Sequence, residues 1–323
     1  MRQEWIDRPE GGTMFGYKLI SGLALGCGRT AARIVLYPIT LYFLIRRGPE
    51  RRASREYLRQ IAGGRNASLW QVAKHLHCFA AVTLDRVFLL SESFKRFDVR
   101  TFGLDQLRQA WAQGRGVLLL GSHLGSFDAL RVLADFRSDI KLRVVIDVEQ
   151  NRNLSDVLNA LNPQLAQSVI NAREEGTTTA LLIKEALDEK SLVTLLADRA
   201  RPGNQVMTAD FLGRPAPFPT APWQLAAALK VPVVLCFGLY RGGNRYDLHF
   251  ETFTDQLKLE RAQRAAELRH TIQRFADRVA HHARIAPYNW FNFYDFWRAD
   301  DSQSAPASAA DAAARDSGRS ARR

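Results

Sequence analysis

A histidine and an aspartate, His123 and Asp128, stand five positions apart directly after the short apolar run Gly116 to Leu120. Such a run is typical of a strand buried on both faces, and the turn after it predicts the start of a helix. The strand would place His123 at the carboxyl edge of a sheet, where Gly125 permits close approach of the backbone. We expect Asp128, on the first helical turn, to fix the tautomer of His123 while the other ring nitrogen removes a proton from a hydroxyl or an amine.

The same pair also has an ordinary structural interpretation. A histidine near a helix N-terminus can serve packing alone, and Asp128 would then lie on a solvated helix face. The spacing by itself decides little, because a pair of this kind arises readily by chance in a chain with 7 histidines and 33 acidic residues. The place of His123 after a buried strand is what favours catalysis.

A second polar cluster follows another apolar run, Leu192 to Ala197. Asp198 stands at the carboxyl end of that run, and a Pro- and Gly-rich segment continues the chain. The arginines of the cluster are Arg199, Arg201 and Arg214. Aromatic and aliphatic side chains interleave with them, which predicts a site with an apolar wall and an anion-binding end. The alternative is a solvated surface loop.

The elements that would position these residues alternate between short apolar strands and helices. The expected strands are Gly116 to Leu120, Leu142 to Val148, Leu192 to Ala197, Val231 to Phe237 and Arg245 to Phe253. The expected helices are residues 54–98, Thr179 to Glu189, Ala221 to Lys230 and Gln256 to Ile285. This alternation predicts an α/β fold with a mostly parallel sheet flanked by helices, and active residues at the carboxyl ends of its strands.

The amino-terminal part is apolar and basic. Its longest uncharged runs, Leu19 to Gly28 and Ile34 to Ile45, have 10 and 12 residues, whereas a spanning helix needs about 20. Arginines interrupt the apolar face and follow it as far as Arg55. We expect residues 1–52 to form membrane-associated helices lying in an anionic interface. The alternative is a long buried helix with solvated arginines.

Composition limits the remaining possibilities. The chain has 323 residues and a net charge of +12, which indicates an acidic partner. Its 3 cysteines are widely spaced and no cluster has the spacing of metal ligands, so neither a disulfide framework nor a metal site is expected. Residues 53–298 are expected to form the α/β domain. Residues 299–323 have the composition of a disordered tail.

Several of these motifs, in this order, resemble the bacterial lipid A biosynthesis acyltransferases of the lysophospholipid acyltransferase superfamily. The matching residues are His123, Asp128, Asp198, Phe211, Gly213, Pro215, Ala216 and Thr220. The resemblance covers roughly residues 14–255, and the segment Tyr288 to Trp297 is similar to a predicted-acyltransferase subgroup. Where the lipid A enzymes commonly read Asn-Trp-Glu, this chain has Ser126, Phe127 and Asp128, and Arg199 replaces a frequent glutamine. These departures surround the region expected to bind the acceptor, so they concern the identity of the acceptor more than the chemistry of acyl transfer.

The resemblance implies transfer of a fatty acyl chain from a thioester of acyl carrier protein or coenzyme A to a lipid or glycolipid acceptor. It implies a place at the cytoplasmic face of a bacterial inner membrane, no cofactor beyond the thioester co-substrate, and no nucleic acid partner. Backbone amides near Gly125 or a nearby arginine are expected to stabilise the oxyanion. The residues expected to bind substrate are Gly125, Ser126, Arg173, Asp198, Arg199, Arg201, Phe211, Gly213 and Thr220.

Two other functions use the same features. A basic membrane-surface or polyanion-binding protein would keep the fold without catalysis, and its arginines would then form a continuous exposed stripe. A hydrolase would use the same base with water in place of the acceptor.

Overall fold

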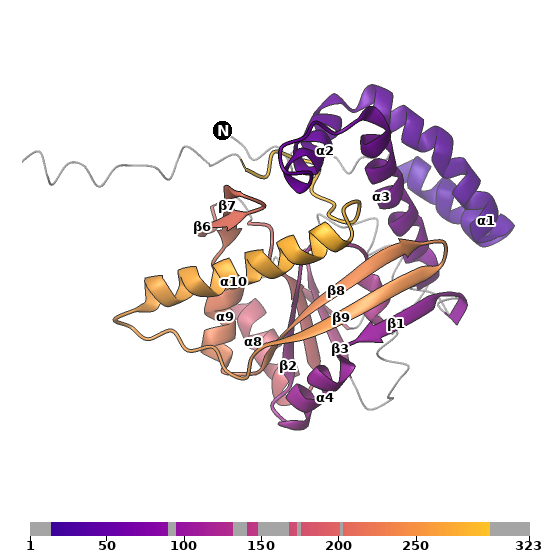
Figure 1. The fold of residues 1–323 in the computed structure, drawn as a ribbon. Helices are drawn as coiled ribbons and strands as arrows, with labels where there is room; N and C mark the ends of the chain where they lie inside the picture. The colour runs from indigo at the N-terminus through magenta and orange to yellow at the C-terminus, as the bar shows by residue number, and fades with distance from the viewer. Residues whose placement is uncertain are drawn as a thin grey trace, which may run out of the picture.

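The computed structural model describes residues 14–89, 95–131, 141–147, 168–172, 176–200 and 203–297 (Figure 1). The helices are α1 (Met14–Arg46), α2 (Gly48–Ile61), α3 (Leu69–Leu89), α4 (Leu104–Ala112), α8 (Gly176–Asp188), α9 (Ala221–Leu229), α10 (Arg264–Ile285) and the 3-10 helix η2 (Asp128–Arg131). The strands are β1 (Asp98–Phe102), β2 (Val117–Gly121), β3 (Leu142–Ile146), β4 (Val169–Asn171), β5 (Leu192–Leu196), β6 (Val206–Phe211), β7 (Arg214–Pro219), β8 (Val233–Gly242) and β9 (Arg245–Thr254).

Seven strands of the described residues form one sheet in the order β1-β9-β8-β2-β5-β3-β4. Every neighbouring pair is parallel except the hairpin of β8 and β9. The predicted α/β class with a mostly parallel sheet is therefore confirmed. The sequence does not predict β1 and β4, because both are short edge strands without a continuous apolar run.

Both faces of the central strands are buried, which explains why their sequences are continuously apolar. Along β2, Leu118 and Leu120 belong to one core cluster, whereas Val117 and Leu119 belong to the other. Side chains of a strand point alternately to opposite faces, so each core takes every second residue. The first core includes α8, α9 and α10, and the second includes α1 and α4.

The amino-terminal helices pack on one end of this sheet, with α1 lying along α3 at the edge of the molecule (Figure 1). The prediction that residues 54–98 form one continuous helical region is wrong. This region divides into the end of α2, all of α3 and the start of β1, because Gly63 and Gly64 adopt positive φ after α2. The helix α2 also runs through the expected boundary between residues 52 and 53.

Two arginines of α1 face inward rather than toward solvent. Arg29 forms two hydrogen bonds to the fully buried carboxylate of Asp85 on α3, at 2.7 and 2.8 Å, and Arg33 lies 3.4 Å from the same carboxylate. The Tyr246 hydroxyl donates to Asp85 as well, at 2.9 Å. The sequence predicts that these arginines interrupt a lipid-facing surface. Instead they attach α1 to the domain, because a buried carboxylate requires charged partners.

The Pro- and Gly-rich segment after β5 is a hairpin rather than a loop. Strands β6 and β7 pair in antiparallel fashion, with Phe211 opposite Arg214. Prolines occupy alternate positions of β7, Pro215, Pro217 and Pro219. Main-chain groups at alternate residues of a strand point to the same edge, so an alternating proline pattern is compatible with pairing along one edge only. The helix expected from Gln256 begins later, at Arg264.

Candidate active site

His123 and Asp198 meet at the carboxyl edge of the sheet. The strands β2 and β5 are parallel neighbours with Gly121 opposite Leu196, and each of the two side chains follows its strand by two residues. The His123 ring Nδ1 lies 2.8 Å from Asp198 Oδ1, and the His123 main-chain N–H donates to Asp198 Oδ2 at 3.0 Å. An ionised carboxylate only accepts hydrogen bonds, so Nδ1 carries the proton and Nε2 is the basic nitrogen.

Asp128 does not hold His123, which corrects the expected pairing. Its Oδ2 accepts a hydrogen bond from Arg86 Nε on α3 at 2.7 Å, and the carboxylate is 13 % exposed. Asp128 begins η2, a short 3-10 helix rather than the expected α-helical turn. The prediction that Asp128 lies at the start of a helix is therefore confirmed. Its carboxylate, however, pairs with Arg86 of α3 instead of with His123.

The local field keeps the imidazole neutral and the carboxylate ionised. Burial lowers the pKa of His123 below its ordinary value, and Arg199 and Arg86 lower it further, while Asp198 acts in the opposite direction. Burial raises the pKa of Asp198, but its contacts with His123 and the charge of Arg199 lower that pKa more strongly, to about 2. At neutral pH the site therefore holds a neutral imidazole oriented by an anion, which is the state required of a general base.

The backbone amides around Gly125 already have acceptors. The N–H groups of Leu124, Gly125 and Ser126 donate to the carbonyl oxygens of Ser122, Asn289 and Gly238, each at 2.7 Å. The sequence leaves two candidates for oxyanion stabilisation, the backbone amides near Gly125 and a nearby arginine, and these three amides are already bonded within the protein. Gly125 is required here for backbone reasons, because its φ is +73° and a Cβ would lie 2.0 Å from the Gly238 oxygen. Ser126 is only 1 % exposed, so it lies beneath the site surface.

The aromatic segment after α10 forms one wall of the site, a role that sequence analysis did not assign. Trp290 bridges Leu124 in antiparallel fashion, and the Phe291 N–H donates to the His123 carbonyl at 2.8 Å. The fully buried His75 of α3 supports this segment from behind. Its Nε2 lies 2.9 Å from the Trp290 oxygen, and burial lowers the pKa of His75 to about 4.

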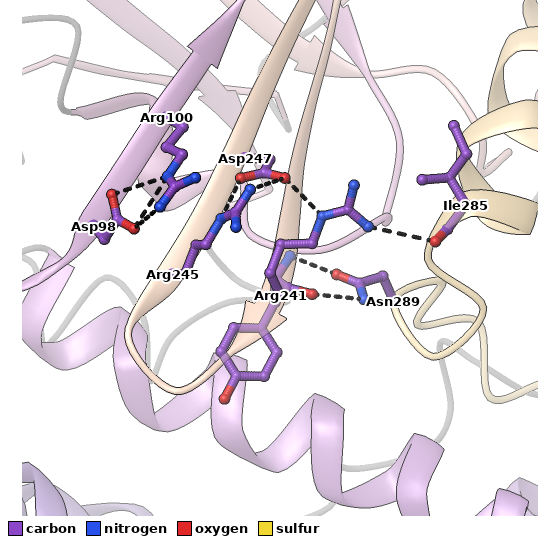
Figure 2. Close-up of polar contacts among 8 residues, drawn as sticks. Asp98, Arg100, Arg241, Arg245, Asp247, Ile285 and Asn289 are labelled. Atoms are coloured by element: carbon purple, nitrogen blue, oxygen red, sulfur yellow. Dashed lines mark hydrogen bonds and ion pairs between the residues drawn. The ribbon is translucent and has the colours of Figure 1, made fainter.

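Two asparagines of this segment contact different parts of the sheet. Asn289 forms hydrogen bonds with both main-chain groups of Tyr240 at 2.7 and 3.1 Å. Figure 2 shows Asn289 on the Arg241 side of a cluster in which Arg241 and Arg245 contact the carboxylate of Asp247. Asn292 contacts the active pair directly. The sequence signal that could have found them is the occurrence of buried asparagines within an otherwise aromatic run, because a buried amide needs hydrogen-bond partners.

Arg199 is held inside the protein. Its Nε donates to Asn292 Oδ1 at 2.5 Å and its Nη2 to the Phe291 oxygen at 2.6 Å, while the guanidinium carbon lies 5.7 Å from the centre of the Tyr294 ring. These contacts make Arg199 a neighbouring cation of the His123–Asp198 pair. The sequence predicts that Arg199 contacts an anionic substrate. In the structure its guanidinium instead contacts three protein groups.

The other expected substrate-binding residues lie apart from His123 or outside the described residues. Phe211 is fully buried and packs against Trp290, with tilted rings whose centres are 5.0 Å apart. Gly213 forms the turn of the β6–β7 hairpin with a φ of +85°, and the Thr220 hydroxyl donates to the Gln205 oxygen at 3.2 Å. Arg173 and Arg201 lie outside the described residues. Within the part of the chain that the structure describes, no group of three or more metal-binding side chains is present.

A family model described as bacterial lipid A biosynthesis acyltransferase matches residues 79–299, more than half of the chain. The match includes His123, Asp198 and the aromatic segment Tyr288 to Trp297. It ends at residue 299, whereas the resemblance noted in the sequence ends at about residue 255. No curated protein matches the chain. The family is one of acyltransferases, in agreement with the predicted enzyme class. This chain belongs to the bacterial lipid A biosynthesis acyltransferase family.

Proposed function

We propose that the protein transfers a fatty acyl chain from a thioester to a hydroxyl or amine of a lipid or glycolipid acceptor, with His123 as the general base. The observation that carries this proposal is the bond between His123 Nδ1 and Asp198 at the carboxyl edge of two adjacent strands. That bond assigns the base to Nε2, which has no hydrogen-bond partner among the described residues. The His123 side chain is 29 % exposed, so a substrate can reach the ring.

The reaction follows from the protonation states of the pair. Nε2 of His123 takes the proton of the acceptor group as the acceptor oxygen or nitrogen bonds to the thioester carbonyl carbon. Asp198 stabilises the imidazolium that forms. The tetrahedral intermediate then breaks its carbon–sulfur bond, and the imidazolium returns the proton to the thiolate. Asp198 thus takes the role that sequence analysis gave to Asp128.

An arginine is the better candidate for oxyanion stabilisation, since the amides near Gly125 are engaged. Arg86 is partly exposed, at 32 % of its side chain, and its charge lowers the pKa of His123, so it lies within electrostatic range of the ring. Asp128 orients Arg86 through their 2.7 Å contact. We propose that this pair presents a fixed positive charge to the developing oxyanion.

The distribution of arginines supports catalysis over polyanion binding. Many arginines of the described residues bind carboxylates or main-chain oxygens of the protein itself, which removes them from a continuous exposed stripe. Such pairs are Arg29 with Asp85, Arg86 with Asp128, Arg214 with Glu56, Arg245 with Asp247 and Arg278 with Glu251. A polyanion would have to compete with these internal partners.

We also propose that α1 and the start of α2 contact the cytoplasmic surface of a bacterial inner membrane. Ile34, Tyr37, Leu41 and Ile45 recur at helical spacing on α1 and are each more than half exposed, so they form an apolar stripe. Exposed Arg46, Arg52 and Arg55 follow the stripe, whereas Arg51 donates to the Leu44 oxygen at the end of α1. Among the described helices, none combines the length and apolarity needed to cross a bilayer.

The test is an acyl-transfer assay with the full-length protein. Acyl carrier protein and coenzyme A thioesters are supplied separately with a bacterial lipid extract, and the products are identified by mass spectrometry. We expect a lipid or glycolipid whose mass increases by one acyl chain, and only free thiol and fatty acid if water is the acceptor. His123→Ala should lower turnover by about 10² to 10⁴. Full acyl transfer by this variant would refute the assignment of the base.

A further inference from the structure

The segment Asn289 to Asn292 crosses the carboxyl edge of three adjacent strands, β8, β2 and β5. Asn289 holds the main chain of Tyr240 on β8, and Phe291 holds the carbonyl of His123 after β2. Asn292 completes the crossing after β5. The segment thus links the ends of three strands that are far apart in sequence. Within the segment, Asn292 is the residue whose side chain contacts the His123–Asp198 pair.

Asn292 stands between an anion and a cation. Its Nδ2 donates to Asp198 Oδ2 at 3.3 Å, and its Oδ1 accepts the 2.5 Å hydrogen bond from Arg199 Nε. The residue is 1 % exposed, so water does not replace either bond. A primary amide is suited to this position because it is neutral and offers a donor and an acceptor on the same plane. A carboxylate, hydroxyl or alkyl group would fail at one contact or both.

We propose that Asn292 is a positioning residue for the His123–Asp198 pair, which rests on the function proposed above. It donates to Asp198 Oδ2, the oxygen that also accepts the His123 main-chain N–H, so that Asp198 Oδ1 remains directed at the imidazole. It also occupies Nε of Arg199, which prevents this arginine from turning that donor toward the neighbouring carboxylate. Asn292 therefore acts through Asp198 and Arg199 and contacts no substrate itself.

Three charged groups act on the imidazole, and Asn292 contacts two of them. Asp198 and Arg199 follow β5, and Arg86 comes from α3. Asp128 of η2 contacts Arg86, and the ring of Tyr294 lies beside Arg199. The neutral amide adds no charge to this set. An aspartate in its place would add a carboxylate facing Asp198, and a negative charge near an imidazole favours the protonated ring.

The test uses two substitutions of Asn292 and a matched control in the full-length protein. Asn292→Asp keeps the shape but loses the donor to Asp198, and Asn292→Ala removes both contacts. Asn289→Asp is the control, because it makes the same chemical change in a buried asparagine of the same segment whose side chain bonds to Tyr240 instead. Nitrogen-15 chemical shifts of labelled histidines report the tautomer and titration of His123, assigned with a His123→Gln sample.

We expect wild-type His123 to show the Nδ1–H tautomer. Asn292→Asp should raise the titration midpoint of His123 by about one pKa unit, and Asn292→Ala should mix the two neutral tautomers. Asn289→Asp should leave the tautomer of His123 unchanged and should shift its midpoint less than Asn292→Asp does, because the Asn289 side chain bonds to Tyr240 and not to Asp198. The proposal is overturned if both Asn292 variants, folded by circular dichroism, show the same tautomer and midpoint as the wild-type protein.

Kinetics provide a second measurement. With an acyl-transfer assay in place, Asn292→Asp should lower kcat by about 10- to 100-fold, as expected when the outer partner of a functional histidine is lost, with little change in KM. An unchanged kcat would contradict the positioning role. If the wild-type protein transfers no acyl chain, the proposed function fails, and the histidine titration still decides whether Asn292 positions the pair.

Discussion

The carboxylate of Asp198 holds the imidazole of His123 across two neighbouring strands, with Oδ1 and Nδ1 2.8 Å apart. The two residues are 75 positions apart in the chain. Their contact follows from the parallel pairing of β2 with β5, which brings the residues after both strands to the same height at the sheet edge. The site therefore depends on strand pairing rather than on the local spacing of His123 and Asp128.

The first prediction compares the two aspartates. Asp198→Asn should reduce kcat by roughly 10³- to 10⁴-fold, because an asparagine no longer fixes the tautomer of the base. Asp128→Asn should have the smaller effect, since it changes the environment of Arg86 and leaves the His123 contact intact. Steady-state rates of both variants with one thioester donor provide the measurement. A larger loss in Asp128→Asn than in Asp198→Asn would restore the pairing expected from sequence.

The second prediction concerns the pH dependence of catalysis. Because burial and the charges of Arg199 and Arg86 lower the pKa of His123 from 6.5, the imidazole stays neutral and active below that pH. The acid limb of kcat/KM should accordingly have its midpoint below pH 6.5. Arg86→Gln removes one positive charge, so it should move this midpoint upward. A midpoint that remains in place in Arg86→Gln would show that the arginine is too distant or too screened to influence the base.

The third prediction concerns the attachment of α1. Removing Asp85 with Asp85→Ala leaves Arg29 and Arg33 without their shared carboxylate, and breaking a buried ion pair in this way costs about 3–5 kcal/mol. Tyr246→Phe removes one hydrogen bond and should cost about 1 kcal/mol or slightly more. Urea unfolding followed by circular dichroism measures both changes. Equal stability of Asp85→Ala and the wild-type protein would mean that apolar packing of α1 on α3 suffices.

The fourth prediction tests the apolar stripe of α1. The combined substitution Ile34→Ser, Leu41→Ser and Ile45→Ser should greatly reduce co-sedimentation with anionic vesicles, because it removes exposed apolar groups without altering the buried face. Leu181→Ser with Leu182→Ser on α8 is the matched control, because both leucines are also exposed. If the α8 variant lost binding and the α1 variant kept it, the membrane contact would lie elsewhere.

The charges of α2 contribute separately. Arg52→Gln and Arg55→Gln should weaken vesicle binding by about 1 kcal/mol per arginine at low ionic strength, and the difference from wild type should shrink as salt increases. The same measurement on neutral vesicles provides the control. A loss of equal size on neutral and anionic vesicles would attribute the effect to folding rather than to charge.

The sequence by itself determined the central strands and the edge at which His123 lies. Strands β2, β5 and β8 were predictable because burial of both faces makes each a continuous apolar run, and a run of five or six residues is a local property. His123 and Asp198 were each placed after such a run. The glycine at position 125 was also recognisable, since close backbone approach leaves no space for a side chain.

Only the tertiary structure decided which groups pair with one another. Asp198 replaced Asp128 as the partner of His123 because strand order, a long-range property, set the neighbours of β2. Arg29 turned toward a buried aspartate although its surroundings in sequence are apolar, and Asn292 reached the site from the segment after α10. Hydrogen bonds require separations near 3 Å, and such distances depend on the packing of elements far apart in sequence.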